Sequence, residues 1–406
     1  MPHRPALLGA PTLIAALLWL GAWMAYKESY VIDGWDLGLH VPTDLQVYLL
    51  AGQRLNEGGL LYDAPLLGDL PFTYPPFAAG IFGWLASLNP EIATIIWQTG
   101  NFVALIAVIL MCFTERRRPV GLFAVLLAVG LFATEPIRGS FHYGQINLIL
   151  MLLVAADVLP RHHRFAGIGV GIAAGLKLTP AFFVIIFLVQ RRFVAAGVSA
   201  ATFVATVVAG FVIVPDAGAF WRSAIFDSER VGVHENPGAQ SIRSVLVRLG
   251  ADSTWLWLVL ALVVTALTAA AAWLALRRDN RTLAIALTGI GACLVSPFSW
   301  FHHWVWIVPL AVAVIAGIAS LFDARGFLTA QLGALLTSGV VFVMLLPYVS
   351  GVLWPALAYP GPWISHPNPV WRLAYTGFGV AFILGYLVWE ARKERISATK
   401  PAGSLS

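Results

Sequence analysis

The sequence predicts an all-α protein that crosses a membrane many times. Of its 406 residues, 59% are hydrophobic and only 11% are charged, whereas an average soluble domain carries about 25% charged residues. The apolar residues gather in continuous runs, most of them long enough to cross the hydrocarbon core as helices. Polar and apolar residues do not alternate along these runs, which argues against a membrane β-barrel.

The apolar runs predict about ten to twelve transmembrane helices in one domain over residues 1–390, followed by a cytoplasmic tail over 391–406. The first run suits an uncleaved span better than a signal peptide, because it is long and ends in tryptophans. The second run is too short to span comfortably. In order, the runs are 7–26, 76–88, 92–113, 120–134, 146–159, 165–190, 194–214, 254–276, 282–295, 301–319, 327–346 and 370–389.

Short basic clusters stand at the ends of the apolar runs and account for much of the net charge of +5. Such clusters favour the cytoplasmic side and do not resemble a nucleic-acid surface. They are Arg116-Arg117-Arg118, Arg161-His162-His163-Arg164, Arg191-Arg192, Arg277-Arg278 and Arg392-Lys393-Glu394-Arg395. If the basic clusters are cytoplasmic, the segments expected on the external face of the plasma membrane are 27–75, 135–145, 215–253, 296–301 and 347–369. We expect a site where these segments converge.

The run 165–190 begins and ends at a basic cluster and is interrupted by Lys177-Leu-Thr-Pro180. Proline removes a helical hydrogen bond, so we expect a break at this point. Two structures satisfy the pattern: a re-entrant pair of half-helices, or one long kinked span. Lys177 in the middle of an apolar run is costly unless it is paired, and it therefore marks a site. A snorkelling lysine is the alternative.

Asp44 follows Pro42-Thr43 and precedes a stretch with helical periodicity, which predicts a short interfacial helix. Two roles fit Asp44 at this position. It can cap the helix, or it can act as a general base at the membrane surface, where a low dielectric raises the pKa of a carboxyl group. Residue chemistry alone favours the cap.

Two further polar groups lie at the ends of apolar runs. His142, Gln145 and Asn147 stand at the head of one run, where the two amides can cap a helix or bind sugar hydroxyls. Trp300-Phe-His302-His303 follows Ser296-Pro297. Adjacent histidines point about 100° apart on a helix, so this pair predicts no metal site. Trp300 fits either an interfacial aromatic belt or stacking on a sugar.

The long segment 215–253 carries several arginines, which run against the positive-inside trend and suit phosphate binding. Together with the groups above, it completes an ordered set of short motifs. The set comprises Asp44-Leu-Gln-Val-Tyr48, Leu61-Tyr62-Asp63, Phe72-x-Tyr74-Pro75-Pro76, Gly144-Gln145-x-Asn147, Gly175-Leu-Lys177-x-x-Pro180, Gln240-Ser241 and Ser296-Pro-x-Ser-Trp-x-His302-His303.

This ordered set resembles the actinobacterial glycosyltransferases of the GT-C fold that use polyprenyl-phosphate sugars. Within them it is most similar to the mycobacterial α-mannosyltransferases of phosphatidylinositol mannoside and lipomannan synthesis. The likeness runs from about residue 13 to 310, and nothing beyond about residue 320 is placed by it. It implies a polyprenyl-monophosphate-mannose donor, a glycolipid acceptor in a membrane setting, an α-1,2 linkage and no cofactor or metal.

The resemblance also implies roles for individual residues. Asp44 matches the catalytic aspartate of the family, which favours the base over the cap. His302 or His303, Lys177 and Arg243 are assigned to the donor phosphate. The residues expected to contact the sugar or the acceptor are Tyr48, Tyr62, Tyr74, His142, Gln145, Asn147, Gln240 and Trp300.

Three other functions fit part of the pattern. A related arabinofuranosyltransferase shares the motif order and differs in the donor sugar. A lipid-linked sugar transporter or flippase suits a broken helix with an intramembrane lysine, but it predicts internal repeats that the sequence lacks. A non-catalytic scaffold leaves Asp44 and the histidine pair unexplained.

Overall fold

The computed structural model describes residues 41–115, 121–132, 134–160, 164–322, 340 and 373–398. Within these residues the chain is helical, and the only β-type pairings are two isolated bridges. The helices are α2 (Thr43–Asn56), α3 (Pro76–Ala86), α4 (Pro90–Glu115), α5 (Gly121–Leu131), α6 (Glu135–Tyr143), α7 (Asn147–Val158), α8 (Ile168–Leu176), η2 (Thr179–Phe183), α9 (Val184–Val189), α10 (Phe193–Ile213), α11 (Ala217–Arg222), η3 (Ala224–Phe226), η4 (Ser228–Arg230), α12 (Ile242–Arg248), α13 (Thr254–Arg277), α14 (Arg281–Val295), η5 (Phe301–His303), α15 (Ile307–Phe322) and α17 (Ala374–Ala398).

The all-α, GT-C-like membrane fold expected from the sequence is confirmed. Among the described residues, four helices are long and apolar enough to cross a membrane: α4, α10, α13 and α17. A fifth span arises if α6 and α7, between which the chain bends by 118°, are counted as one broken crossing. The predicted first span and the run 327–346, apart from residue 340, lie outside the described residues. The total of ten to twelve crossings therefore stays a prediction.

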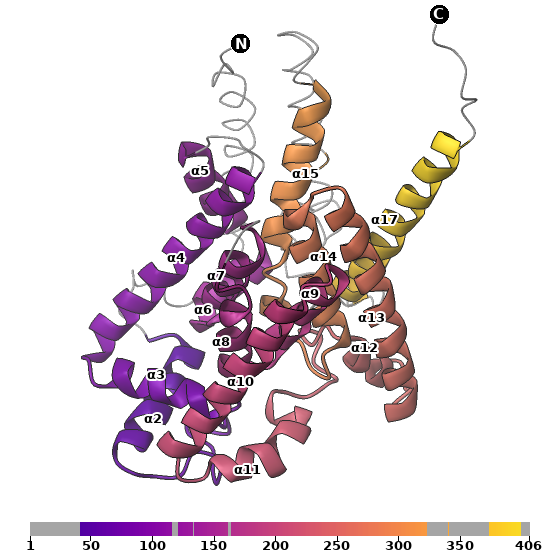
Figure 1. The fold of residues 1–406 in the computed structure, drawn as a ribbon. Helices are drawn as coiled ribbons and strands as arrows, with labels where there is room; N and C mark the ends of the chain where they lie inside the picture. The colour runs from indigo at the N-terminus through magenta and orange to yellow at the C-terminus, as the bar shows by residue number, and fades with distance from the viewer. Residues whose placement is uncertain are drawn as a thin grey trace, which may run out of the picture.

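Helix α2 is the short interfacial helix that the periodicity predicted. It gathers with α3 and α11 at one end of the bundle (Figure 1). Gly52 makes close packing on α3 possible, because a Cβ atom there would lie 2.2 Å from the Phe82 carbonyl oxygen. The capping role considered for Asp44 is wrong. The helix is preceded by Pro42, Asp44 lies inside the first turn, and no side chain caps the helix.

The predicted break at Lys177–Pro180 is present. Helix α8 ends at Leu176, Lys177 is extended (φ −153°, ψ 130°), and η2 begins at Thr179. Helices α8 and α10 run parallel, because Gly167 lies against Ala195 and Gly175 lies against Thr206. The starts of α8 and α10 are therefore at the same level. The chain runs inward along α8 to Lys177 and returns along α9, which makes the segment re-entrant rather than a kinked span.

Basic and acidic side chains tie several helix ends together at the opposite end of the bundle from α2. Arg278 donates to the Glu390 carboxylate at 2.9 and 3.1 Å, and Arg281 donates to the Pro160 carbonyl at 2.8 Å. Helix α17 continues through Ala398, so the boundary expected at residue 390 does not coincide with a helix end and stays a prediction. From this level, α14 leads to Ser296 at the other end of the bundle.

Candidate active site

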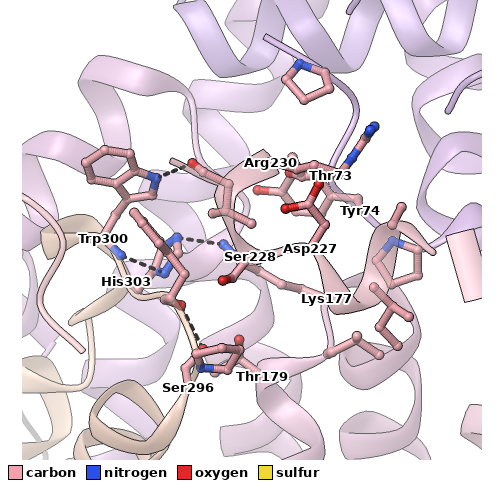
Figure 2. A pocket seen from close by; sticks show the side chains of 18 of the residues that line it. Thr73, Tyr74, Lys177, Thr179, Asp227, Ser228, Arg230, Ser296, Trp300 and His303 are labelled. Carbon is pink, nitrogen blue, oxygen red and sulfur yellow. Dashed lines mark hydrogen bonds between the residues drawn. The ribbon is translucent and has the colours of Figure 1, made fainter. Parts of the chain in front are cut away.

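A cavity of about 520 Å³ opens at the level of α2, where segments distant in sequence meet (Figure 2). Its wall is contributed by α2, the loop before α3, Gln145 at the head of α7, the break after α8, the segment 220–231, Trp257 of α13, and the segment 295–303. The four predicted external segments that the structure describes all reach this wall. The convergence expected from the sequence is therefore observed within the described residues.

The bend between α6 and α7 sets the position of Asp44. Gly144 caps the end of α6 in the left-handed conformation (φ 69°), where residues other than glycine are strained. A Cβ atom there would lie 2.8 Å from the Leu45 Cβ atom and 2.9 Å from that of Pro42. This close approach brings the next residue, Gln145, to the first turn of α2. Its Nε2 atom donates to Oδ2 of Asp44.

Lys177 lies at the turn of the re-entrant segment and faces the head of α7. Its Nζ atom is 3.0 Å from Oδ1 of Asn147, 3.5 Å from Oε1 of Gln145 and 3.0 Å from Nε2 of His303. Within the described part of the chain, no carboxylate forms an ion pair with Lys177. An amide cluster, rather than an acid, therefore holds this ammonium group beside the cavity.

His303 is the histidine of the pair that lines the cavity. Its Nδ1 atom accepts from the Trp300 backbone N–H at 3.2 Å, so the ring hydrogen of the neutral imidazole is on Nε2. Burial, followed by the charges of Lys177 and His302, holds the pKa of His303 well below its usual range. The ring is therefore a neutral donor whose Nε2–H points toward Lys177 (Figure 2).

Asp44 is largely enclosed by the same elements. Burial raises the pKa of Asp44 above its ordinary value of 3.8, while the hydrogen bond from Gln145 and the charge of Lys177 oppose this rise. A carboxyl group in this setting is a better proton acceptor than a free aspartate when it is ionised. Among the described residues, no three His, Cys, Asp or Glu side chains come together as metal ligands would.

The cavity has a second polar wall, formed by Thr73, Asp227, Ser228 and Arg230 (Figure 2). The Arg230 guanidinium contacts the Phe72 carbonyl at a long 3.5 Å, and its Nε atom is buried without a hydrogen-bond partner. Across the described chain no carboxylate pairs with it. Sequence analysis did not select Arg230, because nothing local separates it from the other arginines of segment 215–253.

Seven of the predicted site residues line the cavity: Asp44, Tyr48, Tyr74, Gln145, Lys177, Trp300 and His303. The other six do not. Tyr62 donates to the Tyr74 carbonyl, Oδ1 of Asn147 accepts from Lys177 Nζ, and His142 is exposed at the end of α6. Gln240 is buried and donates to the Pro237 carbonyl, Arg243 stacks over the Trp257 ring at 5.2 Å, and His302 lies among the rings of Tyr143, Trp300 and His303.

Comparison with known proteins places the chain in an enzyme family. The model of glycosyltransferase family 87 matches residues 72–297, which is more than half of the chain. The chain belongs to glycosyltransferase family 87. The enzyme class expected from the resemblance is confirmed, and the transporter and scaffold alternatives are set aside.

Curated relatives of this family 87 member are mycobacterial enzymes. A polyprenol-phosphate-mannose-dependent α-(1-2)-phosphatidylinositol pentamannoside mannosyltransferase of Mycolicibacterium smegmatis is 36% identical, over 86% of this chain and 85% of its own. A protein of the same name from Mycobacterium tuberculosis is 34% identical, over 88% and 83%. A phosphatidylinositol mannoside mannosyltransferase of M. tuberculosis is 35% identical, over 74% and 76%. No solved structure matches the chain.

Proposed function

We propose that this family 87 enzyme transfers mannose, with inversion, from polyprenyl-monophosphate-mannose to a phosphatidylinositol mannoside-type glycolipid, forming an α-1,2 linkage. The observation that carries the chemistry is that Asp44, Lys177 and His303 line one cavity, where the Gln145 amide lies between the Asp44 carboxylate and Lys177. The sugar, the linkage and the acceptor class are supported by the names of the mycobacterial relatives.

Asp44 takes the role of general base. The acceptor hydroxyl oxygen attacks the anomeric carbon of mannose and forms the new C–O bond. The hydroxyl proton passes to the Asp44 carboxylate, while the bond between the anomeric carbon and the phosphate oxygen breaks. Attack on the face opposite the leaving group turns a β-phosphosugar into an α-glycoside.

Lys177 and His303 take the role of stabilising the leaving phosphate. The electron pair of the broken bond stays on polyprenyl phosphate, whose negative charge increases during the reaction. Lys177 Nζ and His303 Nε2 lie 3.0 Å apart, close enough for both to donate to one acceptor placed beside the pair. A phosphate oxygen supplies that acceptor, and preorganised donors of this kind stabilise charge in the transition state.

Arg230 supports the same role from the second polar wall of the cavity. A guanidinium without a carboxylate partner is suited to bind a phosphate through two of its N–H groups. We therefore assign Arg230 to the donor phosphate in place of Arg243, whose guanidinium lies over the Trp257 ring and does not itself line the cavity.

The proposed site faces the exterior of the plasma membrane. The cavity lies at the end of α14 and the head of α7, whereas Arg278, Arg281 and the charged half of α17 gather at the other ends of these helices. Basic residues at helix ends favour the cytoplasm. This arrangement supports a multi-pass plasma-membrane enzyme that draws its lipid donor from the external leaflet.

A donor-by-acceptor assay tests the proposal. Purified protein is incubated with labelled polyprenyl-phosphate-mannose and a phosphatidylinositol mannoside, with and without EDTA, and the product linkage is determined by NMR. We expect an elongated glycolipid with a new α-1,2-mannosyl residue, formed equally well in EDTA. Consumption of decaprenyl-phosphate-arabinose alone would contradict the mannose assignment and favour the arabinofuranosyltransferase alternative.

A further inference from the structure

Gln145 stands between the carboxylate and the ammonium group of the cavity. Its Nε2 atom donates to Asp44, and its Oε1 atom lies 3.5 Å from Nζ of Lys177. Its side chain is buried, with 5% of the residue exposed. No ion pair joins Asp44 to Lys177 in the described structure, so the amide mediates the whole contact between the two charged groups.

Chemistry fixes the orientation of this amide. A lysine ammonium has donors only and an ionised carboxylate has acceptors only. The amide oxygen must therefore face Lys177, and the amide nitrogen must face Asp44. In the reverse orientation the amide N–H groups would face the N–H groups of Lys177, and the amide oxygen would face the carboxylate of Asp44.

A chain of tyrosines supports the same orientation from the protein core. The hydroxyl oxygens of Tyr48 and Tyr74 lie 2.5 Å apart. Tyr74 in turn donates to Oε1 of Gln145 at 3.1 Å. Because Tyr74 has one hydrogen to donate and gives it to Gln145, Tyr48 is the donor in its contact with Tyr74. The Gln145 oxygen is thus occupied by protein donors.

We propose that Gln145 is a positioning residue that holds Oδ2 of Asp44 with its Nε2–H, so that Oδ1 remains for the acceptor hydroxyl. This inference rests on the proposed function, in which Asp44 is the base. It replaces the sugar or acceptor contact expected for Gln145 from the family resemblance, because both ends of the amide are engaged by protein groups. The hydrogen bond from Tyr74, which Tyr48 supports, holds the amide in this orientation.

The test compares Gln145→Leu and Gln145→Glu with the wild-type enzyme in kcat and KM over a range of about pH 4.5 to 8.5. Leucine fills the same space without donating, and glutamate keeps the shape while adding a negative charge beside Asp44. Both changes raise the pKa of the Asp44 carboxyl, because each removes the donor that favours its ionised form. We expect the acid limb of kcat to move to higher pH in both variants, and further in Gln145→Glu.

We also expect kcat of Gln145→Leu to fall by about 10²-fold, the scale of loss for a misplaced reacting group, while KM for the donor stays unchanged. The matched control is Gln98→Leu. Gln98 is a half-buried glutamine on α4 that donates to the Phe141 carbonyl at 2.8 Å and does not line the cavity. Thermal unfolding in detergent establishes that each variant is folded.

Two outcomes overturn the inference. One is an unmoved acid limb in both folded variants, and the other is a rise in KM with kcat unchanged, which is the signature of a substrate contact. Either result leaves the proposed function standing as long as Asp44→Asn is inactive. Full activity of Asp44→Asn would instead remove the proposed base itself.

Discussion

Nζ of Lys177 lies 3.0 Å from Nε2 of His303, although the two residues are 126 positions apart in the sequence. Lys177 reaches this point because the re-entrant segment turns there, and His303 reaches it from the short helix after α14. The pair places a cation and a neutral donor on one side of the cavity. The opposing carboxylate, Asp44, is reached through Gln145.

Removing either member of this pair should reduce turnover strongly. We expect Lys177→Met and His303→Ala each to lower kcat/KM by about 10²- to 10³-fold, the loss seen when one preorganised donor is removed. Rates of mannosyl transfer measured on the folded variants check this. His302→Phe is the matched control, because the ring nitrogens of His302 are buried without partners. An equal loss in His302→Phe would contradict the assignment of His303.

Replacing Arg230 should weaken the donor complex. We expect Arg230→Met to raise KM for polyprenyl-phosphate-mannose and to lower kcat/KM by about tenfold or more, since a charge-assisted hydrogen bond to phosphate contributes roughly 1.5 to 3 kcal/mol. Arg243→Met should change neither value appreciably, because Arg243 does not line the cavity. A larger effect of Arg243→Met than of Arg230→Met would restore the original assignment.

The activity should fall as the pH drops through the pKa of Asp44. A base must be ionised to accept the acceptor proton, and burial raises the pKa of this carboxyl from 3.8. The acid limb of kcat/KM should therefore have its midpoint above pH 3.8. It should persist in His303→Gln, because burial and the charges of Lys177 and His302 hold the pKa of His303 well below its usual range. An acid limb that disappears in His303→Gln would show that His303, and not Asp44, is the titrating group.

The re-entrant segment depends on close packing between α8 and α10. A Cβ atom at Gly175 would lie 2.1 Å from Oγ1 of Thr206. We expect Gly175→Ala to lower the free energy of unfolding by about 1–3 kcal/mol, as overpacking does, and to reduce activity by displacing Lys177. Thermal unfolding and transfer assays measure both effects. Gly197→Ala on α10 is the control, because nothing lies within 4 Å of a Cβ atom there.

Local features of the sequence predicted the helices and the break in the re-entrant segment. Long apolar runs form spans because the hydrocarbon core leaves the backbone few alternatives, and Pro180 cannot continue a helix. The choice between a kinked and a re-entrant path was left open. It is decided by contacts between α8 and α10, which no local pattern encodes.

The site was predicted in part. Lys177 was selected because a lysine is unusual inside an apolar run, whereas the roles of Asp44 and Gln145 came from the family resemblance. Sequence alone did not distinguish His303 from His302. Adjacent residues of a short helix face different neighbours, and only the packing of the helix decides which of the two faces the cavity. Arg230 was missed for a similar reason. Which arginine of a long segment reaches a cavity is set by the path of the segment through η3 and η4, not by composition.

Mannosyl transfer by Asp44→Asn tests most directly whether Asp44 is the general base. Asparagine keeps the shape of the side chain but cannot accept the hydroxyl proton. This role of Asp44 predicts a loss of about 10²- to 10⁴-fold in kcat, the contribution of a general base, with donor binding and thermal unfolding unchanged. Turnover by Asp44→Asn at a rate close to that of the wild-type enzyme would contradict it.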